Sequence, residues 1–291
     1  MLNKILTLTA AVIVIGLPIG SCYGDLVVYE SFSQTPGDLD GQAGGTGLNS
    51  WNATTGTNAV SVVNPPTLTY GDLDNAGGQA NVPSSASTSA WVTTTSALAD
   101  NNLLDDGATL WFSYMFEKAS GGGSNEWAGF AFGTDNLAAA FNGVNMTNGG
   151  NGVGVATRND AVNVATWLGG GNAAQGSGLS ITYGESALVV GKIEWGGTVG
   201  DDETITIYTP STTDLGTIGP GVSKTVTGFD QTLLDTISFT QRNSGGTQIY
   251  DEIRFGDTYA AVTPFTVVPE PSSLSLLGLT GLMMIHRRRR S

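Results

Sequence analysis

The sequence predicts an all-β fold, in which residues 25–265 form one antiparallel β-sandwich. Short runs of β-branched, aromatic and aliphatic residues recur between turn signals, which is the pattern of strands in such a fold. Gly, Ser, Thr and Asn are abundant, and no long stretch has the periodicity of an amphipathic helix. Because no helices alternate with the strands, two packed antiparallel sheets are favoured over a parallel α/β arrangement.

Ten strands are expected along this segment. In chain order they are residues 26–32, 59–63, 91–95, 109–116, 127–132, 153–157, 188–195, 204–208, 236–240 and 249–255. Residues 109–116 are apolar on both faces of the strand, so this strand is expected in the middle of a sheet. Trp111 is expected to pack against neighbouring side chains. The first and last strands are expected to lie close together.

The last strand places one acid in an unusual position. Strict alternation over residues 249–255 puts Ile249, Asp251, Ile253 and Phe255 on one face. A carboxylate on an apolar face must be met by backbone donors or by a cation, because its burial alone is prohibitive. Asp251 is therefore predicted to be a structural residue.

The N-terminus, residues 1–24, has the pattern of a secretory signal peptide. Lys4 supplies a positive start, residues 5–19 are apolar, and residues 21–24 are small enough for cleavage, expected after Gly24. The alternative is lipidation of Cys22, the single cysteine, because residues 19–22 resemble a lipoprotein box.

The C-terminus, residues 266–291, combines three features in a fixed order. Pro269, Glu270 and Pro271 precede a twelve-residue apolar tract, and a basic cluster follows, formed by Arg287, Arg288, Arg289 and Arg290. As a helix the tract would rise about 18 Å, which is short of a bilayer core of about 30 Å. The arginines would stay in the cytoplasm and leave the body outside. A transient membrane anchor is predicted.

This arrangement resembles the PEP-CTERM sorting signal of exported bacterial proteins. The resemblance implies export, retention by the tail, and cleavage near the Pro-Glu-Pro motif by exosortase, a membrane protease. It further implies a final location in the cell envelope or outside the cell, in an organism that makes exopolysaccharide.

A second resemblance concerns the body. Residues 28–32, the glycine-rich segment 41–47 and Trp51 near the start, with residues 250–256 near the end, are similar to laminin G-like or concanavalin A-like jelly-roll proteins with PEP-CTERM tails. The resemblance implies a jelly-roll sandwich. Lectins, hydrolases, lyases and structural domains share that fold, so it defines no activity.

Charge and residue content exclude several classes of function. Without Lys4, Glu270 and the four terminal arginines, residues 25–266 hold 6 basic and 24 acidic residues, a net charge of −18. Nucleic acid is therefore excluded as a partner. The single histidine, His286, lies in the tail, so the body has no Ser-His-Asp or Cys-His nucleophile system and no histidine-based zinc site.

Two kinds of binding residue are candidates. Asp38 and Asp40, and Asp72 and Asp74, lie in oxygen-rich turns that offer ligands to Ca²⁺, although such residues are also ordinary turn formers. Trp51 and Trp167 lie beside Asn and Gly in predicted loops, where an exposed ring stacks on a sugar. Packing in the core is the other interpretation of both tryptophans.

These observations predict an exported envelope or extracellular-matrix protein with a structural or exopolysaccharide-associated role. No enzyme activity and no certain cofactor are assigned. The alternatives are a lectin-like carbohydrate-binding module and a carbohydrate-active hydrolase or lyase. A hydrolase would draw its pair of carboxylates from the body's glutamates, among which the candidates are Glu117, Glu126, Glu185, Glu194 and Glu203.

Overall fold

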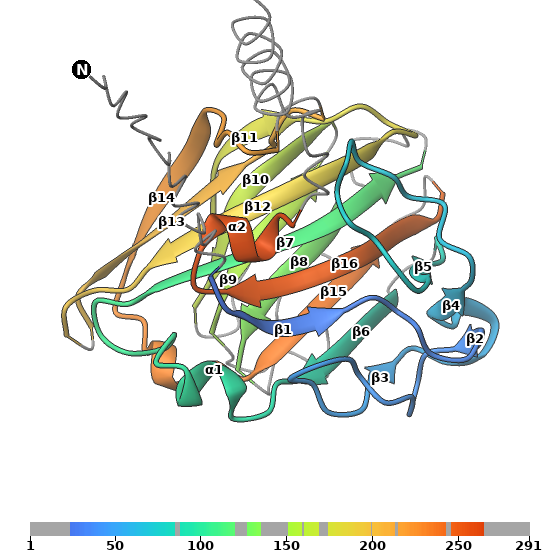
Figure 1. The fold of residues 1–291 in the computed structure, drawn as a ribbon, viewed down its shortest axis with the longest axis horizontal. Coiled ribbons are helices and arrows are strands. Elements are labelled where there is room, and N and C mark those ends of the chain that lie inside the picture. Colours follow the sequence, from blue (N-terminus) through green and yellow to red (C-terminus); the bar gives the residue numbers. More distant parts are fainter. Residues whose placement is uncertain are drawn as a thin grey trace, which may run out of the picture.

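The computed structural model shows two antiparallel β-sheets packed face to face (Figure 1). It describes residues 24–84, 88–119, 127–134, 151–158, 160–168, 174–198, 200–212, 215–242 and 246–264. The predicted signal peptide and the C-terminal tail lie outside these ranges, apart from Gly24. Within the described ranges, no helix has the length and apolar character needed to cross a membrane.

The nine-stranded sheet, here called the front sheet, faces the viewer in Figure 1. Its order is β14 (Gly221–Thr227), β13 (Asp202–Tyr208), β12 (Ser186–Glu194), β7 (Thr109–Lys118), β16 (Gln248–Gly256), β5 (Gln79–Val82), β4 (Ser61–Val63) and β2 (Gly37–Asp38). Strand β1 (Leu26–Glu30) also pairs with β16, antiparallel. The expected proximity of the first and last strands is therefore confirmed.

The seven-stranded sheet, the back sheet, lies behind it. Its order is β11 (Ala174–Ser180), β10 (Ala161–Trp167), β9 (Gly152–Arg158), β8 (Trp127–Gly133), β15 (Thr236–Arg242), β6 (Thr88–Thr93) and β3 (Asn52–Ala53). Two short α-helices, α1 (Ala97–Asp100) and α2 (Tyr259–Val262), and two 3₁₀ turns, Gly56–Asn58 and Gln231–Leu233, complete the described elements. The predicted all-β sandwich is confirmed.

Aromatic side chains from both sheets fill the space between them. Tyr114 of β7 stacks on Phe130 of β8, with ring centroids 4.1 Å apart, and Phe239 of β15 stacks on Tyr250 of β16 at 4.6 Å. The rings interlock because alternate residues of facing strands point inward. One main apolar cluster extends across both inner faces.

The outer face of the front sheet is partly covered. Helix α2 lies across β7 and β16, where the Ser113 hydroxyl donates to the carbonyl of Val262 (Figure 1). A second apolar cluster lies under this cover, between the outer face of β7 and β12 and the loop segments and helix above them. Its buried members are Leu68, Leu73, Met115, Leu188, Val190, Leu215 and Val262. This cover explains why residues 109–116 are apolar in both phases: β7 is central and packed on both faces.

A β-bulge in β16 corrects the predicted alternation. Asp251 pairs with Met115, whereas the regular pairing resumes only with Arg254 opposite Ser113, and Glu252 has a φ of 54°. The extra residue moves Ile253 and Phe255 to the inner face, with Tyr250, and leaves Asp251 with Met115 on the outer face. The prediction that Asp251 shares a face with Ile253 and Phe255 is therefore wrong.

Candidate functional site

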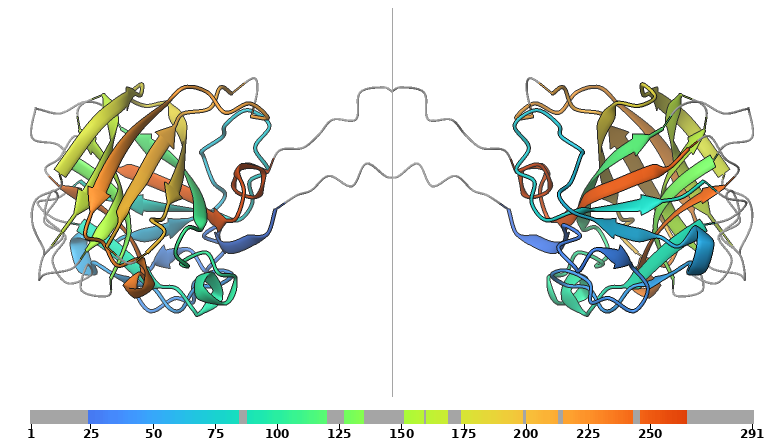
Figure 2. Two further views of the ribbon diagram at one scale, coloured as in Figure 1. Left: turned by 90° about the vertical axis from the view of Figure 1, so that its left-hand side faces the viewer. Right: turned by 90° about the vertical axis from the view of Figure 1, so that its right-hand side faces the viewer.

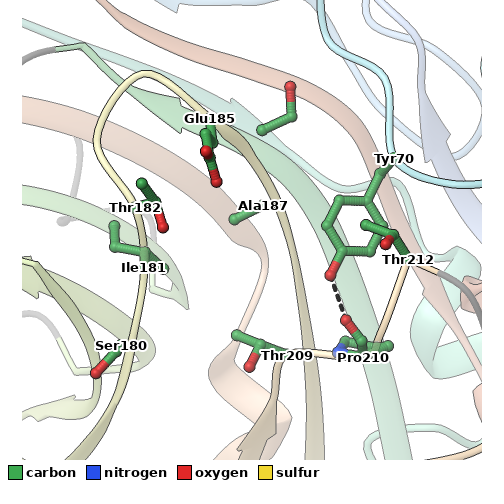
Figure 3. Close-up of a pocket in the computed structure, with 10 residues that line it drawn as sticks. Tyr70, Ser180, Ile181, Thr182, Glu185, Ala187, Thr209, Pro210 and Thr212 are labelled. Carbon is green, nitrogen blue, oxygen red and sulfur yellow. Dashed lines mark hydrogen bonds between the residues drawn. The ribbon is translucent and has the colours of Figure 1, made fainter.

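The candidate site is a pocket at the end of the sandwich where the chain crosses from β11 of the back sheet to β12 of the front sheet. It encloses about 240 Å³. Figure 3 shows the Tyr70 ring on one side and Ile181 with Thr182 on the other, with Ala187 between them. The remaining lining residues are Ser180, Glu185, Ser186, Thr209, Pro210 and Thr212.

Backbone contacts hold the Tyr70 wall in place. The Tyr70 hydroxyl donates to the carbonyl of Pro210 (Figure 3), and its burial raises the pKa of Tyr70, so the phenol stays a neutral donor. Gly71 has a φ of 54°, and a Cβ there would lie 2.2 Å from the Thr212 carbonyl oxygen. The glycine therefore permits the segments of Tyr70 and Thr212 to pack directly on each other.

The opposite wall is fixed in the same way. The N–H of Ile181 donates to the carbonyl of Asp160 at 2.7 Å, and the N–H of Gly184 donates to the carbonyl of Lys118 at 2.9 Å. Gly184 has a φ of 70°, which a turn of this kind requires. The two walls are thus set by the fold and need no ligand to form.

The chemistry of the lining suits a hydroxylated ligand. Six hydroxyl groups line the pocket, on Tyr70, Ser180, Thr182, Ser186, Thr209 and Thr212. Among the ten lining residues Glu185 alone is charged, and it is exposed. A two-carboxylate hydrolysis would need a second acid, which this lining does not supply. The arrangement offers hydrogen bonds and an aromatic surface.

A second polar cluster forms around Glu30 at the end of β1, and it is structural. Glu30 is wholly buried, and its carboxylate accepts hydrogen bonds from the N–H groups of Phe32 at 2.7 Å and Gly45 at 2.9 Å, and from Trp51 Nε1 at 2.8 Å. Gln34 Nε2 donates to both carboxylate oxygens at 3.0 Å. The glycine-rich segment and Trp51 therefore assemble around this carboxylate.

Next to it, β16 contributes a buried ion pair. The Arg254 guanidinium contacts the Glu252 carboxylate and the carbonyl of Asp74. Glu252 also accepts from the N–H of Ala76 at 2.7 Å and from the Tyr29 hydroxyl at 3.2 Å. Burial raises the pKa of Glu252. Burial of Tyr29, together with the nearby negative charge of Glu252, raises the pKa of Tyr29 to about 12. Through these contacts the ion pair connects Tyr29 of β1, and the segment that contains Asp74 and Ala76, to the bulge in β16.

Asp251 directly precedes Glu252 in β16 and is wholly buried. Its Oδ1 accepts from the N–H of Glu252 at 2.7 Å, whereas Oδ2 has no hydrogen-bond partner. Burial, and then the Glu252 charge, raise the pKa of Asp251 from 3.8 to about 9. The side chain is therefore protonated at neutral pH, which avoids a further buried negative charge beside Glu252.

Stability should fall as the pH rises from about 4 to about 9. Over that range folded Asp251 keeps a proton that the unfolded chain has lost, which costs at most about 1.4 kcal/mol per pH unit. Asp251→Asn removes the titration and preserves the shape. We expect its melting temperature to exceed that of the wild type at pH 8 and to approach it at pH 4, as measured by thermal unfolding at four pH values. A constant difference at every pH would contradict the assignment.

Both tryptophans predicted to bind glycans are in the core. Trp51 and Trp167 are each 1% exposed. Trp51 packs against Phe32 and Phe239, with ring centroids 5.7 and 5.4 Å away, and Trp167 ends strand β10. A buried ring cannot stack on a sugar, so the prediction that these two residues bind glycans is wrong, and their other interpretation, packing in the core, holds.

The four aspartates proposed for Ca²⁺ do not come together as a ligand set. In the part of the chain that the structure describes, no three Asp, Glu, His or Cys side chains are placed to hold a metal ion. Asp40 instead accepts from the N–H of Ala53 at 2.9 Å, the role of a turn-forming aspartate. Asp38, Asp72 and Asp74 are exposed.

The glutamates considered for hydrolysis are dispersed. Glu185 lies in the pocket, Glu194 pairs with Lys192 at 2.9 Å, and Glu203 is buried, with a pKa raised by burial and then by Asp202. Glu117 is opposite Ile249 in the front sheet, and Glu126 lies outside the described residues. The pocket thus contains one of the five.

The tail supplies the decisive comparison. Residues 267–290 match a family model described as a PEP-CTERM protein-sorting motif. The tail is a PEP-CTERM sorting motif. Its match covers Pro269, Glu270, Pro271 and the four arginines, as the sequence predicted. The curated proteins contain no match to this chain.

Solved structures with a similar body belong to proteins of different kinds. A protein of unknown function from Shewanella oneidensis MR-1 has 16% identity and a TM-score of 0.48, over 78% of this chain and 85% of that one. A carbohydrate esterase from the Shiga toxin-encoding bacteriophage phi24B has 14% identity and a TM-score of 0.47, over 81% and 99%. An alginate lyase from Aplysia kurodai has 8% identity and a TM-score of 0.48, over 79% and 98%. At these values no activity transfers to this protein.

The pocket residues were not predicted as a site. Tyr70, Ile181 and Pro210 are far apart in sequence and look like ordinary loop residues. Only Glu185 was singled out, as one of five glutamates. In the sequence, the feature that these residues share is that Tyr70 and residues 180–182 are next to predicted turns. This feature is too common to identify a pocket.

Proposed function

We propose that this protein is exported, held briefly by its PEP-CTERM tail, cut by an exosortase-type protease, and retained at the cell surface as a polysaccharide-associated component. The observation that carries the proposal is the sorting motif at residues 267–290. The predicted signal peptide at residues 1–24 supplies export, and the acidic body suits an aqueous exterior.

The geometry of the body supports attachment through its ends. Gly24 lies against Thr258, and the N–H of Asp257 donates to the carbonyl of Asp25 at 3.3 Å. The N–H of Asp74 donates to the carbonyl of Pro264 at 3.0 Å. Strand β1 and α2 lie on the same side of the sandwich (Figure 2). The signal peptide and the tail join the body on the same side.

The tail motif should control release from the membrane. In the producing organism, a variant with Pro269, Glu270 and Pro271 all changed to alanine should accumulate in the membrane fraction at its uncut mass, because the protease no longer recognises it. A variant with Ser272 and Ser273 changed to alanine is the matched control and should be processed normally. Equal release of both variants would count against sorting through this motif.

The polysaccharide role rests on the pocket, which supplies hydroxyls, one carboxylate and an aromatic wall but no second acid for hydrolysis. A binding role is therefore favoured over a hydrolytic one. Retention at the surface should be lost when the producer's own polysaccharide is removed enzymatically or by mutation of its synthesis.

A further inference from the structure

We infer that the pocket between Tyr70 and Ile181 binds an uncharged sugar unit of a polysaccharide and discriminates against uronic-acid polymers. This inference rests on the proposed function and adds the class of ligand. It is carried by the shape of the pocket, the content of its lining, and the charge around it.

The shape suits one flat, partly apolar ring. Tyr70 presents an aromatic side chain opposite Ile181, and Ala187 lies between them (Figure 3). The C–H face of a pyranose packs on such an aromatic surface, which is how shallow sugar sites gain most of their apolar contact. A volume of about 240 Å³ is below the range of about 300–1,000 Å³ typical of pockets for drug-sized ligands, so one sugar unit and not a long segment is expected inside.

The polar groups are complementary to hydroxyls. Thr182, Ser186 and Thr209 can each donate and accept, and the Glu185 carboxylate accepts from two hydroxyls at once. Hydrogen bonds to a charged acceptor are the stronger kind. Because the walls are already held by the Tyr70–Pro210, Ile181–Asp160 and Gly184–Lys118 hydrogen bonds, little ordering is needed on binding.

Charge selects against acidic ligands. Glu185 is the single charged residue of the lining, and the body carries a net charge of −18. A uronate would place its carboxylate near Glu185, and the lining has no basic residue to pair with it, so the contact is repulsive. Neutral glycans meet no such penalty.

The test is native affinity electrophoresis of the full-length protein in a zwitterionic, sugar-free detergent. The gels contain a neutral β-glucan, a neutral α-glucan, a galactomannan or polygalacturonate, each over a series of concentrations. We expect retardation by at least one neutral polymer, with a dissociation constant between micromolar and millimolar, and none by polygalacturonate. Retardation by polygalacturonate alone, or by none of the four, would overturn the inference. Surface retention and tail cleavage would remain separately testable.

Variants locate the binding in the pocket. Tyr70→Ala should weaken binding at least about tenfold by removing the aromatic ring. Tyr70→Phe keeps the ring and loses only the hydrogen bond to Pro210, so it should bind within about threefold of the wild type. Glu185→Gln should weaken binding roughly tenfold. Asp38→Asn, an exposed acid on β2 at the far edge of the front sheet, is the charge-matched control and should leave binding unchanged. Unfolding curves confirm that each variant is folded. Unchanged binding by folded Tyr70→Ala and Glu185→Gln would exclude this pocket.

Discussion

Arg254→Met is expected to lower the free energy of unfolding by about 3–5 kcal/mol, because it leaves the buried Glu252 carboxylate without its cation. Arg254 is 2% exposed and contacts both Glu252 and the carbonyl of Asp74. Glu252 is wholly buried, so water cannot replace the lost partner. Urea unfolding, followed by tryptophan fluorescence, measures the difference.

Two further variants separate the ion pair from the loss of packing. The double variant Glu252→Leu with Arg254→Met removes both charges and should recover much of the lost stability, since a buried pair often costs as much as it contributes. Lys192→Met breaks the exposed pair with Glu194, and a loss below about 1 kcal/mol is expected. If Arg254→Met cost no more than Lys192→Met, the buried network would not stabilise the fold.

Glu30→Ala is expected to have a similarly large effect, about 3–5 kcal/mol. It leaves the buried N–H groups of Phe32 and Trp51, and the part-buried N–H group of Gly45, without their acceptor. Each buried unsatisfied donor costs about 1–3 kcal/mol. The loss should be seen in urea unfolding and accompanied by a change in the fluorescence of Trp51, whose indole N–H loses its partner.

Glu30→Gln provides the graded comparison. It retains one acceptor oxygen and the shape of the side chain, so an intermediate loss of stability is expected. Glu185→Ala, at an exposed glutamate of the pocket, should change the unfolding free energy by less than about 0.5 kcal/mol. Equal stability of Glu30→Ala and Glu185→Ala would show that the carboxylate does not organise the glycine-rich segment.

Strand positions could be predicted where composition was unambiguous. All ten predicted strands overlap observed ones, and residues 109–116 fall within β7, the central strand that their two-sided apolar pattern indicates. Six observed strands were not predicted: the two-residue strands β2 and β3, and β5, β10, β11 and β14. The Gly, Ser and Thr content of β11 and β14 resembles that of turns, whereas the alternating valines of β10 were a strand signal that the prediction missed. In the folded protein, hydrogen bonding to adjacent strands outweighs a weak intrinsic preference of a segment for the β conformation.

The site was less predictable, for physical reasons that particular residues show. The bulge at Glu252 inverts the remaining alternation of β16, and no residue type before it signals an extra residue. Trp51 is flanked by polar residues, yet its ring reaches the core because Glu30, twenty-one residues earlier, provides a buried acceptor. The pocket combines segments around residues 70, 181 and 210, which are far apart in the sequence and meet only in the folded sandwich.

The measurement that tests the central claim most directly is the intact mass of the protein recovered from the native cell surface. The account predicts a chain that begins at Asp25 and ends near Pro269-Glu270-Pro271, without residues 1–24 and without the four terminal arginines. A chain that begins at a lipidated Cys22 would show that the N-terminus is processed as a lipoprotein and is not cleaved after Gly24. Recovery of a chain that still carries residues 272–291 would contradict sorting and cleavage through the PEP-CTERM tail.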